Sequence, residues 1–245
     1  TGNVCSPTRT ALMTGRYQQR LGLYTAGEAG SGEPMQEKIF PQFLQPAGYT
    51  SMQIGKWHLG PTPEWSPALR GFAEVFGFLG RGAHDYYDFT DAEHPLYRGT
   101  TPVKPEGYLT DLFGTEAVAF IERHKAKPFF LYLAFNAVHA PLQAPADEIA
   151  RFNTGDANRN TRLAMGKRMD DAIGNVVAKL KREGLWQNTL LFFISDNGGP
   201  LAQSASNAPL RGGKHADYEG GVRVPFFVCW PAQLKPGESQ AVVSA

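Results

Sequence analysis

The chain has the composition of a globular protein and a nearly balanced charge. Of its 245 residues, 42% are hydrophobic and 19% are charged, which allows one domain with a sizeable core. The net charge of +1 excludes a global field that would attract nucleic acid or an anionic membrane, so any anion binding must come from a local cluster. No apolar run approaches the roughly 18 residues of a membrane span, and we expect none.

Two cysteines, Cys5 and Cys229, are too few for a disulfide framework. The chain begins at Thr1 without a leader, and a dense motif starts at residue 5. We therefore expect this sequence to be a piece of a longer protein, in which case the missing leader says nothing about location.

Predicted helices and strands alternate along the chain. Helices are expected where apolar residues recur at helical spacing or follow a proline start, at 7–13, 37–47, 109–124 and 163–183. Strands are expected at short apolar runs, at 49–54, 129–135, 190–194 and 224–228. Residues 60–105 are rich in Gly, Pro and aromatic residues and indicate a long irregular loop region.

This alternation predicts an α/β fold. Short, fully apolar strands between helices are typical of a mostly parallel central sheet with helices on both faces. Ligands of such folds bind beyond the carboxyl ends of the strands. The predicted strand ends lead to Lys56 and His58, to residues 136–139, and to residues 195–197, so we expect these segments to meet at one site.

The first candidate site residue is Cys5, in Cys5-Ser6-Pro7-Thr8-Arg9. Cys5 precedes a predicted helix, where backbone N–H groups and the helix dipole favour negative charge. Arg9 lies one turn further along the same helical face. The same residues also fit a buried cysteine at a helix start.

Later segments carry further candidates. Lys56 and His58 are two residues apart at a strand end and point the same way, although an exposed Lys and a packed His would give the same pattern. His139 follows the strand at 129–135, and a histidine titrates near neutral pH, as a general acid must. Asp196 and Asn197 offer oxygens that suit a hard cation such as Ca²⁺, but Asp-Asn-Gly is also a common turn sequence.

Taken together, these motifs resemble one family in order and spacing. The run C-S-P-T-R-T-A-L-M-T-G-R-Y resembles the C-x-P-x-R signature of the type I sulfatases. The segments G-K-W-H-L-G, V-H-A-P, S-D-N-G-G and P-L-R-G-G-K…E-G-G-V-R-V-P resemble later motifs of the same family, which is alkaline-phosphatase-like in fold. Among its members, the chain is most similar in pattern to arylsulfatases and N-acetylgalactosamine-6-sulfatases. The resemblance implies a single, partial catalytic domain over 1–245.

The resemblance also implies a mechanism. In this family a maturation enzyme oxidises the motif cysteine, here Cys5, to formylglycine, whose hydrate is a geminal diol. One hydroxyl attacks sulfur and the other later expels sulfate by C–O cleavage, whereas a sulfated serine would need a second attack on sulfur. Lys56 and Lys214 carry over as sulfate contacts, and a protonated His139 as the group near the leaving oxygen. The complete implied catalytic set is Cys5, Arg9, Lys56, His58, His139 and Lys214.

The implied cofactor is one Ca²⁺ per site, held by Asp196 and Asn197. Two parts of the family pattern are absent: a strand expected before Thr1, which ends in an acidic pair of metal ligands, and a C-terminal subdomain. Because Ca²⁺ prefers six to eight oxygens, Asp196 and Asn197 alone are too few, and we expect this chain not to hold the metal by itself. Glu219 and Arg223 are expected to form a buried structural pair.

The substrate is expected to be a sulfated carbohydrate or an aryl sulfate. His84 and Asp85 resemble pocket-lining residues and are candidate sugar contacts or structural residues. The aromatic side chains around them fit a carbohydrate: Tyr86, Tyr87, Phe89 and Tyr97. Two alternatives stay open, a phosphonate or phosphodiester hydrolase of the same superfamily and a non-catalytic binder of sulfated glycans. The family resemblance implies a periplasmic, secreted or lysosomal location.

Overall fold

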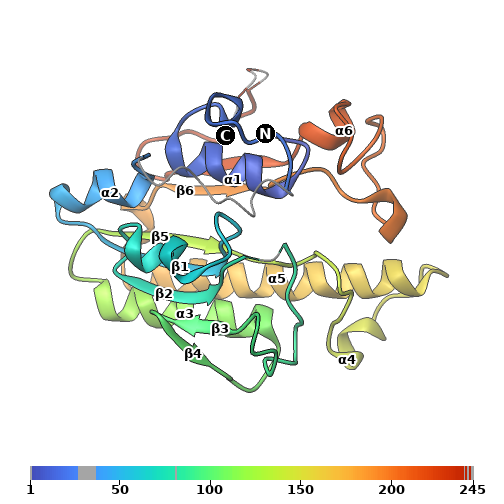
Figure 1. The fold of residues 1–245 in the computed structure, drawn as a ribbon, viewed down its shortest axis with the longest axis horizontal. Helices are drawn as coiled ribbons and strands as arrows, with labels where there is room; N and C mark the ends of the chain where they lie inside the picture. Colours follow the sequence, from blue (N-terminus) through green and yellow to red (C-terminus); the bar gives the residue numbers. More distant parts are fainter. Residues whose placement is uncertain (1, 27–36, 81, 240, 242, 244–245) are drawn as a thin grey trace.

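A five-stranded mixed sheet forms the centre of the protein, with strand order β4-β3-β2-β1-β5 (Figure 1). The computed structural model describes residues 2–26, 37–80, 82–239, 241 and 243. Strands β1, β2 and β5 run parallel, and β3 and β4 add an antiparallel edge. The strands are β1 (Thr50–Lys56), β2 (Glu74–Phe78), β3 (Leu96–Arg98), β4 (Thr101–Val103), β5 (Phe129–Ala134), β6 (Leu191–Ile194) and β7 (Phe226–Cys229).

Helices cover both faces of this sheet. Helices α3 and α5 lie together on one face, and α1 lies on the other side (Figure 1). The α-helices are α1 (Cys5–Thr14), α2 (Phe40–Leu44), α3 (Leu109–His124), α4 (Ala146–Ile149), α5 (Ala157–Arg182) and α6 (Glu219–Val222). Short 3₁₀ turns are η1 (Gln18–Leu21), η3 (Gln45–Ala47), η4 (Pro63–Trp65), η5 (Pro67–Leu69), η6 (Trp186–Asn188) and η7 (Leu201–Gln203).

Two apolar cores follow from the alternation of side chains along the strands. Met52 and Ile54 of β1 point to the face under α3, where they pack with Phe113. On the opposite face, Val75 of β2 packs with Met13 of α1. The sheet is therefore buried on both sides, and its strand ends are fixed relative to α1.

Strands β6 and β7 form a separate antiparallel pair. The sequence predicted both as buried strands, and this part of the expectation was wrong: Phe192 is 57% exposed and Phe227 is 63% exposed. On β6 only Phe192 is exposed and its neighbours are half-buried, whereas most of β7 is exposed, so part of the surface of this pair has no covering layer among the described residues.

The other element boundaries follow the predictions unevenly. Helix α3 spans the predicted residues 109–124. Helix α5 begins six residues before the predicted start, at Ala157, where the Asp156 side chain accepts a hydrogen bond from the Arg159 N–H and caps the helix. The predicted loop region 60–105 contains β2, β3 and β4. Because this region is rich in glycine and proline, its sequence pattern indicated a loop and not these short strands.

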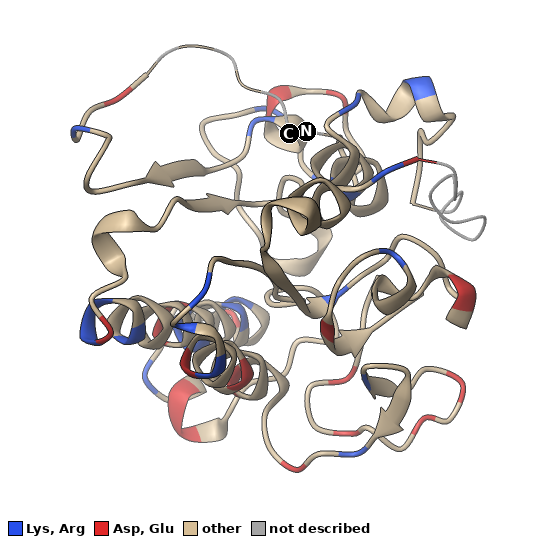
Figure 2. Ribbon diagram, turned by 90° about the vertical axis from the view of Figure 1, so that its left-hand side faces the viewer, with Lys and Arg blue, Asp and Glu red and all other residues tan. Residues whose placement is uncertain are grey.

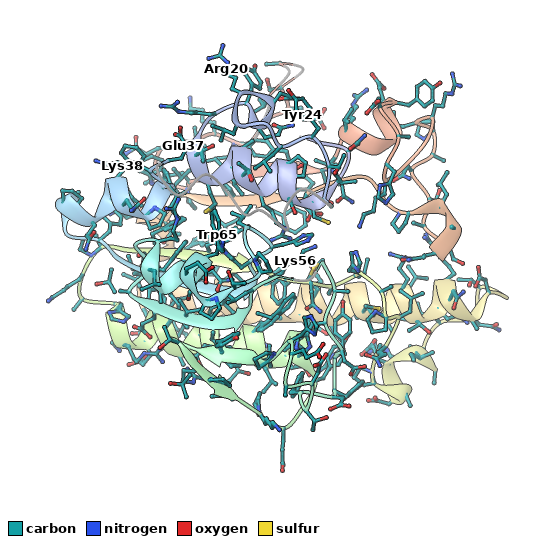
Figure 3. The ribbon with its side chains drawn as sticks, in the orientation of Figure 1. Arg20, Tyr24, Glu37, Lys38, Lys56 and Trp65 are labelled. Carbon is teal, nitrogen blue, oxygen red and sulfur yellow. The ribbon has the colours of Figure 1, made fainter. Side chains whose placement is uncertain are left out.

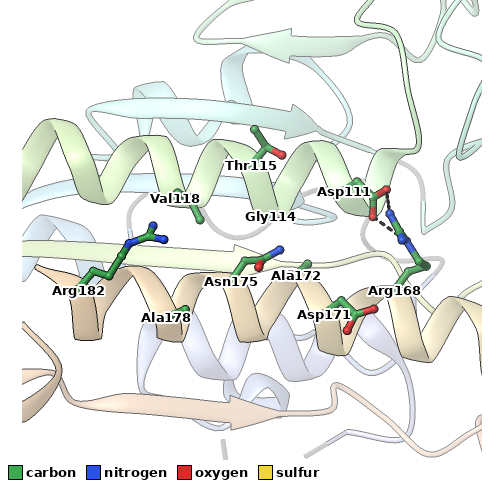
Figure 4. A pocket seen from close by; sticks show the side chains of 10 residues that line it. All are labelled: Asp111, Gly114, Thr115, Val118, Arg168, Asp171, Ala172, Asn175, Ala178 and Arg182. Atoms are coloured by element: carbon green, nitrogen blue, oxygen red, sulfur yellow. Dashed lines mark hydrogen bonds and ion pairs between the residues drawn. The ribbon is translucent and has the colours of Figure 1, made fainter.

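A cavity of about 470 Å³ lies between α3 and α5 (Figure 4). Its rim includes an ion pair between Arg168 of α5 and Asp111 of α3, and Arg182 lies at the other end. No predicted site residue lines it. Lys and Arg residues are interspersed with Asp and Glu residues on the helices, as the near-zero net charge predicts (Figure 2). In the described part of the chain, no helix combines the length and apolar composition that a membrane crossing needs.

Candidate active site

Cys5 is the first residue of α1 and is 2% exposed. Its Sγ donates to Oδ1 of Asn197 at 3.4 Å, and Nζ of Lys214 lies 3.6 Å from the same sulfur. A cysteine that was simply packed in an apolar core would have neither an amide oxygen nor an ammonium beside its sulfur. Three segments that are far apart in the sequence thus meet at one sulfur atom, at a helix N-terminus that favours negative charge.

Arg9 fixes the position of Asp196. Its Nε and Nη2 donate to Oδ2 of Asp196 at 3.1 and 3.0 Å, and its Nη1 donates to the backbone carbonyl of Lys56 at 3.0 Å. Burial would raise the pKa of Asp196, but the charges of Arg9 and Lys56 lower it well below its usual range. The carboxylate is therefore ionised. Nε and one Nη2 donor of Arg9 hold this carboxylate, and Nη1 is used by Lys56 and Tyr132.

Lys56 and His58 follow β1 into the interior. Lys56 is 2% exposed and lies near the centre of the molecule (Figure 3). Burial lowers the pKa of the Lys56 ammonium, and the charge of Arg9 lowers it further. Burial also lowers the pKa of His58 to about 2, helped by the charge of Lys56. His58 is therefore neutral at physiological pH, packed in the site with an unpartnered Nδ1 among the described residues.

His139 faces Lys214. Nζ of Lys214 lies 3.0 Å from Nε2 of His139, and Nδ1 of His139 lies 2.9 Å from the carbonyl of Ala140. This arrangement fits a neutral imidazole that donates from Nδ1 and accepts at Nε2. Burial lowers the pKa of His139 to about 4, with the Lys214 charge acting in the same direction. The imidazole is therefore neutral in the unliganded protein, whereas the expected part of His139 in the reaction needs its protonated form.

All six predicted catalytic residues lie in one cluster with Asp196 and Asn197. Cys5 contacts Asn197 and Lys214, and Lys214 contacts His139. Through Asp196, Arg9 connects this group to the end of β6. His58 joins it by electrostatic interaction rather than by a direct hydrogen bond.

His84 and Asp85 are engaged within the fold. The ring nitrogens of the buried His84 lie 2.9 and 3.0 Å from the carbonyls of Asp85 and His94. The Asp85 carboxylate accepts from two backbone N–H groups and from Nε2 of Gln143. Both ring nitrogens of His84 are used within the fold, whereas Oδ2 of Asp85 accepts one bond and keeps capacity for another. These contacts fit the structural alternative for His84.

The surrounding aromatic loop is also more buried than a sugar platform would be. Tyr86 is 0% exposed and Phe89 is buried, whereas Tyr87 is exposed. Glu219 and Arg223 form an ion pair at 3.3 Å, but both side chains are exposed, so the expectation of a buried pair was wrong.

Sequence reasoning missed three residues that support the cluster. The hydroxyl of Tyr132 in β5 lies 3.2 Å from Nη1 of Arg9. Tyr86 and Arg162 contact the backbone around His139. Tyr132 alone carried a usable signal, because a tyrosine inside an apolar strand needs a partner for its hydroxyl. Tyr86 and Arg162 act across 53 and 24 residues, and no local pattern reports such contacts.

The residues present do not make a complete Ca²⁺ site. Asp196 and Asn197 supply carboxylate and amide oxygens beside Cys5, but Ca²⁺ takes roughly six to eight. Across the described ranges, no group of three or more His, Cys, Asp or Glu side chains could hold a metal ion. The fit of the described residues to Ca²⁺ is therefore partial.

Comparisons with known proteins agree on one family. A family model described as Sulfatase matches residues 1–245. An uncharacterized sulfatase, YdeN of Escherichia coli (strain K12), is 33% identical over 273 residues, which cover 99% of this chain and 47% of YdeN. The N-acetylgalactosamine-6-sulfatase of Mus musculus is 35% identical over 266 residues, which cover 96% of this chain and 50% of that enzyme.

A solved structure matches equally well. The crystal structure of Ps i-CgsB in complex with k-i-k-neocarrahexaose superposes with a TM-score of 0.87 at 38% identity, over 94% of this chain and 56% of that chain. The chain thus spans about half the length of the curated relatives it matches.

Proposed function

The chain belongs to the sulfatase family, and on this premise we propose that the protein that carries it hydrolyses sulfate monoesters. The observation that supports this most strongly is the setting of Cys5, whose sulfur meets Lys214 and Asn197 at the start of a helix. A group that reacts with an anionic ester needs such a preorganised positive environment, since stabilisation of developing charge is usually the largest catalytic contribution.

Each residue of the cluster has a proposed part in this reaction. Conversion of Cys5 to formylglycine would supply a hydrated aldehyde that attacks sulfur and later releases sulfate. Lys56 and Lys214 would bind the sulfate oxygens, because both ammonium groups approach Cys5. His58 is neutral and would donate or accept a hydrogen bond without adding charge.

Release of the alcohol requires a proton at the leaving oxygen. Nζ of Lys214 and Nε2 of His139 lie 3.0 Å apart, so both face the same point beside Cys5. His139 is neutral at rest, and a bound sulfate ester would add negative charge beside it. We propose that His139 takes up a proton when the ester binds and passes it to the leaving oxygen, while Lys214 keeps its ammonium.

Asp196 and Asn197 would hold part of a divalent-cation site, for which Ca²⁺ is the family's ion. When bound, such an ion polarises the sulfuryl oxygens. The function of Arg9 towards this site is independent of the ion, because Arg9 keeps Asp196 ionised and oriented.

We further propose a sulfated carbohydrate as substrate. Support comes from two relatives, an N-acetylgalactosamine-6-sulfatase and a protein crystallised with a neocarrahexaose. The proposed maturation enzyme and a periplasmic, secreted or lysosomal location are supported by family membership alone.

Parallel assays on an aryl sulfate and an aryl phosphonate test the proposed function. The intact protein, produced with a formylglycine-generating enzyme, should hydrolyse the sulfate far faster than the phosphonate. Cys5→Ala should abolish the activity, while Cys229→Ala in β7 should retain it. A preference for the phosphonate would replace the proposed reaction with the alternative hydrolase, and activity that survives Cys5→Ala would remove Cys5 from the mechanism.

A further inference from the structure

The backbone on both sides of His139 is held by buried side chains from other parts of the fold. The hydroxyl of Tyr86 donates to the carbonyl of His139 at 3.0 Å. Nη1 of Arg162 donates to the carbonyl of Val138 at 2.9 Å. The N–H of His139 donates to the carbonyl of Asn136 at 2.8 Å. The consecutive carbonyls of Val138 and His139 therefore accept hydrogen bonds from two distant segments, and the His139 N–H closes a local turn.

Tyr86 is itself rigidly mounted. Its side chain is 0% exposed and stacks on Tyr108, with ring centroids 5.5 Å apart. Its backbone N–H donates to Oε1 of Gln143 at 2.9 Å, and Nε2 of Gln143 donates to Asp85 at 2.9 Å. The Asp85–Gln143–Tyr86 network thus ends at the carbonyl of His139.

Arg162 holds the other side from α5. Besides Val138, its Nε donates to the carbonyl of Gln203 at 3.0 Å, and its Nη2 donates to Oε1 of Gln203 at 3.3 Å. Gln203 belongs to the segment after β6 that leads from Asn197 towards Lys214. Arg162 therefore ties the His139 loop to the segment that carries its partner Lys214.

We propose that Tyr86 and Arg162 are positioning residues for His139, which fix the orientation of its imidazole towards Lys214. This inference rests on the proposed function, in which His139 protonates the leaving oxygen. Without the two donors, the loop could shift, and a misplacement of about 1 Å in a reacting group can cost about 100-fold in rate. The same assignment gives Asp85 a role, as the anchor of Gln143 and through it of Tyr86.

The leaving group of the substrate separates positioning from general stabilisation of the fold. A proton donor matters most for a poor leaving group and little for an activated one. Tyr86→Phe should therefore lower kcat/KM about tenfold more on phenyl sulfate than on 4-nitrophenyl sulfate, mainly through kcat. Tyr49→Phe is the matched control, because Tyr49 lies just before β1, outside the His139 loop and the aromatic loop, and is 39% exposed. It should behave as the unmodified protein on both esters.

A second pair of variants tests the other side of His139. Arg162→Gln should give the same leaving-group dependence. Arg159→Gln, one turn earlier on α5, is the control. It loses a 3.3 Å contact with the carbonyl of Ser204 but none with the His139 loop, so it should show no leaving-group dependence. Equal losses on both esters in the Tyr86 and Arg162 variants would overturn the proposal, as would no loss.

Imidazole ¹⁵N NMR gives a readout that needs no turnover. The His139 signals can be assigned by their loss in His139→Gln. In the unmodified protein they should show a protonated Nδ1 and an unprotonated Nε2. Tyr86→Phe and Arg162→Gln should shift these signals towards a mixture of tautomers, and Tyr49→Phe should not. If the protein hydrolyses neither ester, the proposed function fails, while unchanged His139 signals in both variants would refute the positioning role itself.

Discussion

Nζ of Lys214 lies 3.0 Å from Nε2 of His139, so a lysine and a histidine are within hydrogen-bond distance of each other beside Cys5. The pKa of His139 is about 4, chiefly because the ring is buried and partly because Lys214 is charged. The imidazole of His139 is therefore neutral at rest. Sequence motifs identified both residues, but only their geometry reveals that they act as a pair.

Removal of the Lys214 charge should raise the pKa of His139. Lys214→Gln leaves the ring buried, so the pKa should rise from about 4 only part of the way to its ordinary value. An NMR titration of the His139 Cε1–H signal measures this shift. Lys235→Gln, in an exposed segment, is the control and should leave the titration unchanged. A lower pKa in Lys214→Gln would contradict the pairing.

Arg9→Lys should destabilise the protein although it preserves charge. A lysine cannot reproduce the two bonds to Asp196 and the bonds to Lys56 and Tyr132. Breaking such a buried ion pair costs about 3 kcal/mol. Denaturant melting measures the loss. Arg16→Lys changes an exposed pair with Glu37 and should cost less than about 1 kcal/mol. Equal effects at both positions would show that the Arg9 network contributes little.

Acid should destabilise the protein before its carboxylates titrate. Burial lowers the pKa of His139 to about 4, whereas an unfolded histidine titrates near 6.5. Between these values the unfolded chain binds more protons, so stability is fully present above about pH 6.5 and falls as the pH drops towards 4. Melting temperature against pH measures this slope. His139→Gln should reduce the slope, with the neutral His58 contributing the remainder, and His215→Gln, at an exposed position, should not change it. A slope unaffected by His139→Gln would contradict the buried neutral state.

Gly55 should tolerate no side chain. Its φ is +97°, and a Cβ built there would lie 2.1 Å from the carbonyl oxygen of Ala134 in β5. Gly48 also has a positive φ, +81°, but its Cβ would meet nothing within 4 Å. Gly48→Ala should therefore cost about 1–2 kcal/mol for the left-handed backbone. Gly55→Ala should cost about 1–3 kcal/mol more, because β1 and β5 must separate. Equilibrium unfolding compares the two, and equal costs would remove the steric explanation.

Much of the fold was predictable where the spacing of apolar residues in the sequence is also what buries one face of the element. Helix α3 has apolar residues at helical spacing along its whole length, and its predicted bounds were confirmed. The start of α5 was not, because its first turns are polar and only the Asp156 cap marks them. The α/β class with a mostly parallel sheet was confirmed by the structural match. The exposed faces of β6 and β7 were missed, since apolar runs predict burial whether or not a covering element is present.

The candidate site divides in the same way. Motifs at strand ends correctly indicated that Lys56, His139 and Asp196 would lie near Cys5. Protonation states could not be predicted, because the low pKa of His139 depends on burial and on Lys214, which lies 75 residues away. The aromatic loop shows a second limit. Its tyrosines and phenylalanine fitted a carbohydrate by residue type, but the structure buries Tyr86 completely, because burial depends on contacts distant in the sequence.

The central claim is that Cys5 is the precursor of the catalytic group. Mass spectrometry of the tryptic peptide that ends at Arg9 tests it most directly, on protein made in a host with a formylglycine-generating enzyme. We predict a peptide lighter than the unmodified one, in which residue 5 carries an aldehyde that reacts with a hydrazide probe, and no such change at Cys229. A peptide that carries only the unmodified Cys5 thiol, from a host that converts a known sulfatase in parallel, would contradict the account.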